Sequence, residues 1–132
     1  MIKISDFKVG KDAVLSIRKV YELTDPIIVP VEKVGTRYVH IDRGRMMRFT
    51  VPDWKEDPSY LTVVNEAYQY VLFRNMEEYE KLANRLANIQ ELLELKRKLH
   101  ILSVDTLSDE QLDIMLHAYQ KIYDIEKEKK NG

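Results

Sequence analysis

The sequence contains no cysteine, which excludes disulfide bonds, thiolate metal sites and a cysteine nucleophile. No apolar run approaches the roughly 20 residues that a transmembrane helix needs, and residues 1–10 lack the apolar stretch of a signal peptide. These absences together lead us to expect a cytoplasmic protein that does not enter a membrane.

Sequence motifs of catalysis are absent as well. The four glycines are isolated, so they form no phosphate-binding loop, and neither G-x-S-x-G nor H-E-x-x-H occurs. The carboxylates fall on helix faces among Lys and Arg side chains, and no two stand out as a general acid–base pair. We therefore expect a protein that is not an enzyme, with no catalytic residue and no cofactor.

The three histidines, His40, His100 and His117, give little reason to expect a metal ion. Asp113 and His117 are four residues apart, so on a helix they can share one face. Two ligands do not make a metal site, and an acid–histidine pair at this spacing is usually a solvated surface contact. The prediction is that no metal is bound.

The amino-acid composition is compatible with a packed core but does not indicate a binding partner. Hydrophobic residues form 45% of the 132-residue chain, close to the globular average. The net charge of −1 is too small to identify nucleic acid as a partner. A binding surface must therefore come from local clustering of charge.

The first half of the chain alternates apolar and polar residues between turn signals, as short β-strands do. Gly35-Thr36 fits a two-residue type II′ hairpin turn, and Arg43-Gly44 fits a second short turn. Pro30 cannot donate a ladder hydrogen bond, so its strand must lie at an edge or carry a bulge. Residues 52–68 are left open as helix, strand or irregular segment. Strands are predicted over residues 13–20, 27–34, 37–42, 45–51 and 70–73.

Alternation also assigns the two faces of these strands. One face carries Arg18, Tyr38, His40 and Arg48, while the other is apolar and should form a small core. Such a meander closes into a small barrel or a strongly curled antiparallel sheet. The core side chains are predicted to be Leu15, Ile17, Val29, Val31, Val39, Ile41, Met47 and Phe49.

The second half carries the signals of two helices. Asn75 with Glu78, and Ser108 with Gln111, have the spacing of capping boxes. Apolar residues then recur at intervals of three and four, which predicts helices over about 76–99 and 109–128. Because the connection is short, the helices should form an antiparallel hairpin. The fold class is therefore α+β, with a β-rich unit over 1–74 and a helical hairpin over 75–132.

The last helix has more apolar surface than one stripe requires. Ile114, Ala118 and Ile125 lie off its main stripe. This surplus fits a homodimer or another partner at the hairpin. It fits equally well a wider stripe that is buried against the β-rich unit.

One basic cluster is the candidate binding surface. Within residues 37–48 the only acidic residue is Asp42, and basic side chains alternate with an aromatic ring. Guanidinium groups can contact phosphates while the ring stacks on a base. The alternative is that these side chains merely cover the solvent face of a hairpin. The cluster consists of Arg37, Tyr38, His40, Arg43, Arg45 and Arg48.

Several segments resemble small SH3-like proteins of phages and integrative elements of Gram-positive bacteria. Residues 7–10 (Phe-Lys-Val-Gly) are similar to the entry of the first strand, and residues 31–41 to the central hairpin. Residues 73–79 and 108–112 resemble the starts of the two helices in such proteins. The resemblance implies an SH3-like barrel followed by a helical hairpin, and no catalytic residue. Because short proteins of these elements include anti-CRISPR proteins, the resemblance also suggests an anti-CRISPR role by analogy.

Three functional hypotheses follow. The first is a non-enzymatic interaction protein of a phage or mobile element that binds a host protein or ribonucleoprotein, for example to inhibit a CRISPR–Cas nuclease. The second is a nucleic-acid-binding module that uses the basic hairpin 37–48. The third is a structural oligomer that is joined through the helical hairpin.

Overall fold

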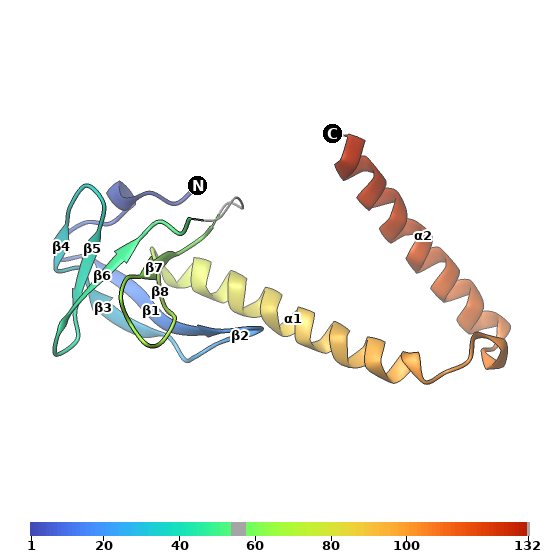
Figure 1. Ribbon diagram of the computed structural model, residues 1–132. Coiled ribbons are helices and arrows are strands. Elements are labelled where there is room, and N and C mark those ends of the chain that lie inside the picture. Colours follow the sequence, from blue (N-terminus) through green and yellow to red (C-terminus); the bar gives the residue numbers. More distant parts are fainter. Residues whose placement is uncertain (54–57, 132) are drawn as a thin grey trace. The chain divides into compact units, whose positions relative to one another are not determined.

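The computed structural model describes residues 1–53 and 58–131, in which an antiparallel sheet of eight strands precedes two helices (Figure 1). The predicted α+β class, with a curled sheet and a helical hairpin, is confirmed. The helices are α1 (Met76–His100) and α2 (Asp109–Asn131), and two 3₁₀ turns are η1 (Ile4–Asp6) and η2 (Val104–Thr106). The strands are β1 (Asp12–Lys19), β2 (Glu22–Leu23), β3 (Ile27–Pro30), β4 (Lys33–Val34), β5 (Val39–Asp42), β6 (Met46–Thr50), β7 (Leu61–Val63) and β8 (Tyr70–Phe73).

The sheet curls because one bent segment, residues 27–34, pairs with strands at both of its ends. The strand order is β2-β1-β8-β7-β6-β5-β4, and β3 pairs with β1. Just after β3, the Val31 amide donates to the Lys11 carbonyl at 2.9 Å, and the Glu32 amide donates to the His40 carbonyl at 2.8 Å. The continuous strand predicted over 27–34 is therefore two strands. The chain bends next to Pro30, whose ring nitrogen has no hydrogen to give to a ladder.

The hairpin between β4 and β5 differs from the predicted two-residue turn. Val34 pairs with Val39, so four residues, 35–38, form the connection. The Gly35 amide donates to the Tyr38 carbonyl at 2.9 Å. Gly35 is not among the glycines with positive φ, and a type II′ turn would need a positive φ at this position. In the next turn Gly44 does have a φ of 83°.

Two strands were not foreseen. β7 arises from the segment 52–68 that the sequence left open, and it pairs with β6 through Thr62 and Val63 and with β8 through Leu61 and Thr62. Asn65 follows with a φ of 59° and turns the chain toward β8. Short β2 forms a hairpin with the end of β1. Residues 54–57 of the open segment lie outside the described residues.

The main core lies inside the curled sheet and agrees with the predicted alternation. Seven of the eight predicted core side chains are buried, while Ile17 is half-buried. Ile2 and Phe7 from the N-terminal segment complete this core. A second apolar cluster forms on the opposite face of β1 and β8, where Val14, Val71 and Phe73 are buried.

The first half of α1 covers this second cluster. The Asn75 side chain accepts a hydrogen bond from the Glu78 amide at 2.9 Å, which confirms the predicted N-cap. The Glu78 carboxylate binds the guanidinium of Arg74 instead of closing a capping box, and Arg74 also binds Asp6 at 2.9 Å. Tyr79 is buried against Phe73, with ring centroids 5.6 Å apart.

Two compact units result, Met1–Glu91 and Leu92–Gly132. Strand gives way to helix at residues 74–75 as the sequence indicated, but the first half of α1 belongs with the sheet because Tyr79 and Leu86 are buried. At the start of α2, Ser108 accepts from the Gln111 amide at 3.1 Å, and the Gln111 side chain accepts from the Ser108 amide at 2.8 Å. The predicted capping box is confirmed. In its described residues α2 has no buried side chain.

Candidate functional site

Three basic side chains lie in register across the outer face of β4, β5 and β6. His40 on β5 pairs with Lys33 on β4 and with Arg48 on β6. Their neighbours Val39 and Phe49 are fully buried in the core. Because successive side chains on a strand point to opposite faces, the row 33–40–48 must face outward.

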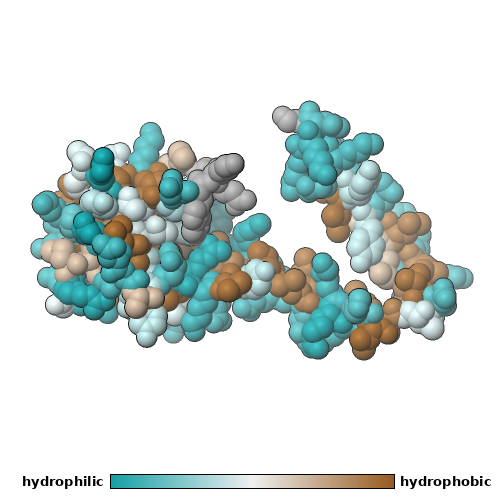
Figure 2. Space-filling model, viewed as in Figure 1, coloured by the Kyte–Doolittle hydropathy of each residue, from teal (hydrophilic) through white to brown (hydrophobic). Residues whose placement is uncertain are grey.

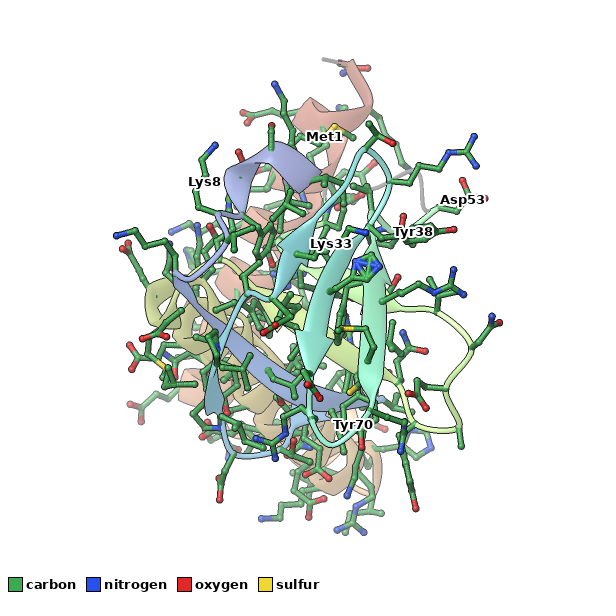
Figure 3. The ribbon with its side chains drawn as sticks, turned by 90° about the vertical axis from the view of Figure 1, so that its left-hand side faces the viewer. Met1, Lys8, Lys33, Tyr38, Asp53 and Tyr70 are labelled. Carbon is green, nitrogen blue, oxygen red and sulfur yellow. The ribbon has the colours of Figure 1, made fainter. Side chains whose placement is uncertain are left out.

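Tyr38 adds an aromatic ring to this row. The guanidinium carbon of Arg48 lies 5.0 Å from the centre of the Tyr38 ring, a cation–π contact. The His40 ring meets Tyr38 edge-on, with ring centroids 6.4 Å apart. Figure 3 looks onto these strands and shows Lys33 and Tyr38 on the same part of the sheet. We call Lys33, Tyr38, His40 and Arg48 the basic face.

The surroundings of His40 disfavour the protonated form of its imidazole. Burial lowers its pKa, and the nearby charges of Lys33 and Arg48 lower the pKa further. Its buried Nδ1 has no hydrogen-bond partner in the described part of the chain. An anion bound at this face would raise the pKa of His40 again, because its negative charge would offset the charges of Lys33 and Arg48 and would stabilise the protonated imidazole.

Arg45 is neutralised by an acidic residue that is distant in the sequence. Its Nε and Nη2 atoms donate to the two carboxylate oxygens of Glu66, at 2.9 and 2.7 Å. This bidentate pair raises the pKa of Arg45 and lowers the pKa of Glu66. Arg45 is therefore poorly placed to bind another anion, although its sequence position suggested that role.

Arg37 and Arg43 lie at opposite ends of β5. Arg37 is exposed in the connection 35–38, next to Tyr38 in the sequence. Arg43 lies in the turn after β5 and lines, together with Arg45 and Tyr70, a cavity of about 220 Å³. Of the six candidate residues, the structure thus brings together Tyr38, His40 and Arg48, with Arg37 in the adjoining connection, and it sets Arg43 and Arg45 apart.

Sequence reasoning missed Lys33. A two-residue turn at Gly35-Thr36 would place Lys33 opposite Tyr38, whereas the four-residue connection places it opposite His40. The position of Lys33 just before the predicted turn could have marked it as a candidate. The side chain opposite Lys33, however, depended on the length of the connection before β5. Register therefore decided which side chain of the basic face lies opposite Lys33.

The pair considered for a metal ion lies on the surface of α2. The Nδ1 atom of His117 lies 3.3 Å from an Asp113 carboxylate oxygen, and both side chains are exposed. Within residues 1–53 and 58–131, no three His, Asp or Glu side chains are gathered as metal ligands. No helix in that part of the chain is long and apolar enough to cross a bilayer.

Comparison with known proteins points to phages. A comparison with curated proteins gives no match, and a comparison with solved structures also gives none. Residues 1–126 match the family model of the phage ProQ C-terminal-like domain, which covers the sheet, α1 and most of α2. The phage association that the sequence resemblance implied is confirmed, whereas the SH3-like barrel and the link to anti-CRISPR proteins stay predictions. The chain belongs to the family of phage ProQ C-terminal-like domains.

Proposed function

We propose that this phage protein binds single-stranded nucleic acid through the basic face. The observation that carries the proposal is the stack of the Arg48 guanidinium on the Tyr38 ring, in register with His40 and Lys33. Proteins that bind single strands combine cations along the backbone with aromatic platforms for the bases. Both components occur here, the cations on β4 and β6 and the aromatic ring in the connection before β5.

Charge pairing supports this choice of surface. In the described part of the chain, no carboxylate forms an ion pair with Lys33, Arg37 or Arg48. These cations can therefore contact phosphates without first giving up a carboxylate partner. Arg45 lacks that freedom because Glu66 holds both of its donors.

A binding role is also favoured over a catalytic one by the chemistry of the basic face. Its groups are permanent cations, an aromatic ring and an imidazole whose pKa is lowered, a set suited to phosphates and bases. A ligand of this kind is consistent with the cytoplasmic location expected from the sequence. Binding of a host protein such as a CRISPR–Cas nuclease stays a prediction, and no contact in the described residues favours it over nucleic acid.

The test is fluorescence anisotropy with labelled single strands of about 16 nucleotides, one of RNA and one of DNA, titrated at several salt concentrations. Tyr38→Ala should weaken binding by about 5- to 150-fold, the range expected for the loss of one stacked base. Arg48→Ala should weaken binding and also reduce the salt dependence, by about 0.7 in the log–log slope for each lost phosphate contact.

Arg45→Ala is the matched control, because it removes an arginine from the same hairpin whose charge Glu66 already satisfies. We expect its affinity to stay within about twofold of wild type. Preference for the RNA strand would indicate contacts to the 2′-hydroxyl. Absence of binding to either strand at low salt, or an equal loss in Arg45→Ala and Arg48→Ala, would refute the proposal.

A further inference from the structure

The apolar surface of α2 is far larger than one helix contact requires. Leu116, Tyr119, Ile122 and Tyr123 are each at least 60% exposed. Each residue advances the helix by 100°, so the apolar side chains of α2 cover an arc of about 200° of its circumference. Ile114 lies at one edge of this arc and Leu116 at the other. A helix that packs on one neighbour needs a stripe of roughly 100°.

A second apolar surface precedes it in the same compact unit. Figure 2 shows hydrophobic side chains along the second half of α1, the connection and α2. A face of about 200° is wide enough for two helix neighbours, so α2 can pack on α1 within the hairpin and on a second molecule at the same time. The exposed apolar side chains before α2 are Leu92, Leu93, Leu95, Leu99, Ile101, Leu102 and Val104.

The charges along α2 favour a second copy of the same helix running in the opposite direction. Residues 109–113 hold three acidic side chains and no basic one, while residues 127–131 hold three lysines and one glutamate. Two antiparallel copies place each acidic start beside the basic end of the other. Parallel copies would instead place like charges together.

The available area is close to what a stable dimer buries. Seven large apolar side chains of α2 and seven more between Leu92 and Val104 are exposed, and at roughly 100 Å² each they offer roughly 1,400 Å² per copy, of which about half is left for a second copy when the other half is used within the hairpin. A specific interface of standard size buries about 800 Å² on each partner. A self-complementary patch of this kind is typical of an isologous twofold interface.

We propose that the protein is a homodimer in which the α2 helices of two copies pack antiparallel, centred near Tyr119. The contact uses the half of the apolar face that the hairpin leaves open, so the dimer core is a four-helix bundle. The inference does not depend on nucleic-acid binding, since it uses only residues 92–131.

Sedimentation equilibrium tests the oligomeric state. At micromolar concentration we expect twice the chain mass of 15.6 kDa, and Tyr119→Glu with Ile122→Glu should reduce it to one chain mass. The control pair His117→Glu with Lys121→Glu lies on the polar side of the same helix and should leave the dimer intact. A monomeric wild type would overturn the proposal, and so would equal dissociation of both variants.

Disulfide trapping tests whether the two α2 helices run antiparallel. Because the sequence has no cysteine, an introduced cysteine is the only thiol on each chain. Leu112 and Glu126 are equidistant from Tyr119, so antiparallel packing brings Leu112 of one copy beside Glu126 of the other. We expect a covalent dimer when Leu112→Cys and Glu126→Cys are mixed and oxidised, and far less from either variant alone. Efficient cross-linking of each variant with itself would indicate parallel packing and refute the antiparallel arrangement.

Discussion

Tyr79 fastens α1 to the sheet by two separable interactions. Its hydroxyl donates to the Thr24 carbonyl at 2.9 Å, and its ring packs edge-on against Phe73. Tyr79→Phe removes only the hydrogen bond. Because the Thr24 carbonyl also accepts from the Ser16 hydroxyl at 2.8 Å, it keeps a partner, and we expect a loss of about 0.5–1 kcal/mol in the free energy of unfolding.

Tyr79→Ala removes the ring as well. The side chain is 9% exposed, so its deletion leaves a cavity, and truncation of a buried aromatic costs about 3–5 kcal/mol. In a unit of this size each kcal/mol corresponds to a decrease in melting temperature of about 4–8 °C. The phenylalanine variant should thus melt a few degrees lower, and the alanine variant should be severely destabilised.

Urea and thermal unfolding followed by circular dichroism measure both changes. Tyr68→Phe is the matched control, since that side chain is 65% exposed, and its stability should stay within about 0.5 kcal/mol of wild type. If the free energy of unfolding of Tyr79→Ala lay within about 1 kcal/mol of the wild-type value, α1 would not be packed on β1 and β8. The assignment of its first half to the sheet unit would then be wrong.

Two further predictions concern the basic face and the start of α1. The pKa of His40 is lowered below its ordinary 6.5, so its contribution to stability is complete above about pH 6.5 and is lost as the pH falls through the folded-state pKa. Urea titrations of wild type and His40→Gln should therefore diverge toward pH 5, and nucleic-acid binding should tighten toward acid pH in wild type only, because bound phosphate favours the imidazolium. Asn75→Ala should lower the free energy of unfolding by about 1 kcal/mol, whereas Asn75→Asp should be close to neutral, since either side-chain oxygen can accept from the Glu78 amide; equal losses in urea unfolding would argue against the cap.

Local pattern was sufficient for both helices, for most of the strands and for most of the core. Alternation in the strands identified Leu15, Val39 and Phe49 as buried, because the period of two admits only one face per residue. Capping residues located both helix starts, since the Asn75 and Ser108 side chains satisfy amides only three residues away. These features depend on neighbours along the chain.

The candidate surface depended on contacts that no local pattern contains. Arg45 belongs to the same basic run as Arg48, but Glu66 comes from a loop 21 residues away and neutralises it. Lys33 lies opposite His40 and not opposite Tyr38 because the connection before β5 has four residues. A change of loop length shifts which side chains are paired across the hairpin.

By itself, then, the sequence determined that this chain forms a curled sheet and two capped helices, because propensity, periodicity and capping act over a few residues. Only the tertiary structure decided that half of α1 joins the sheet through Tyr79 and Thr24, 55 residues apart, and which cations remain unpaired. Such long-range pairings follow from register and burial. They form only when distant segments have already been brought together.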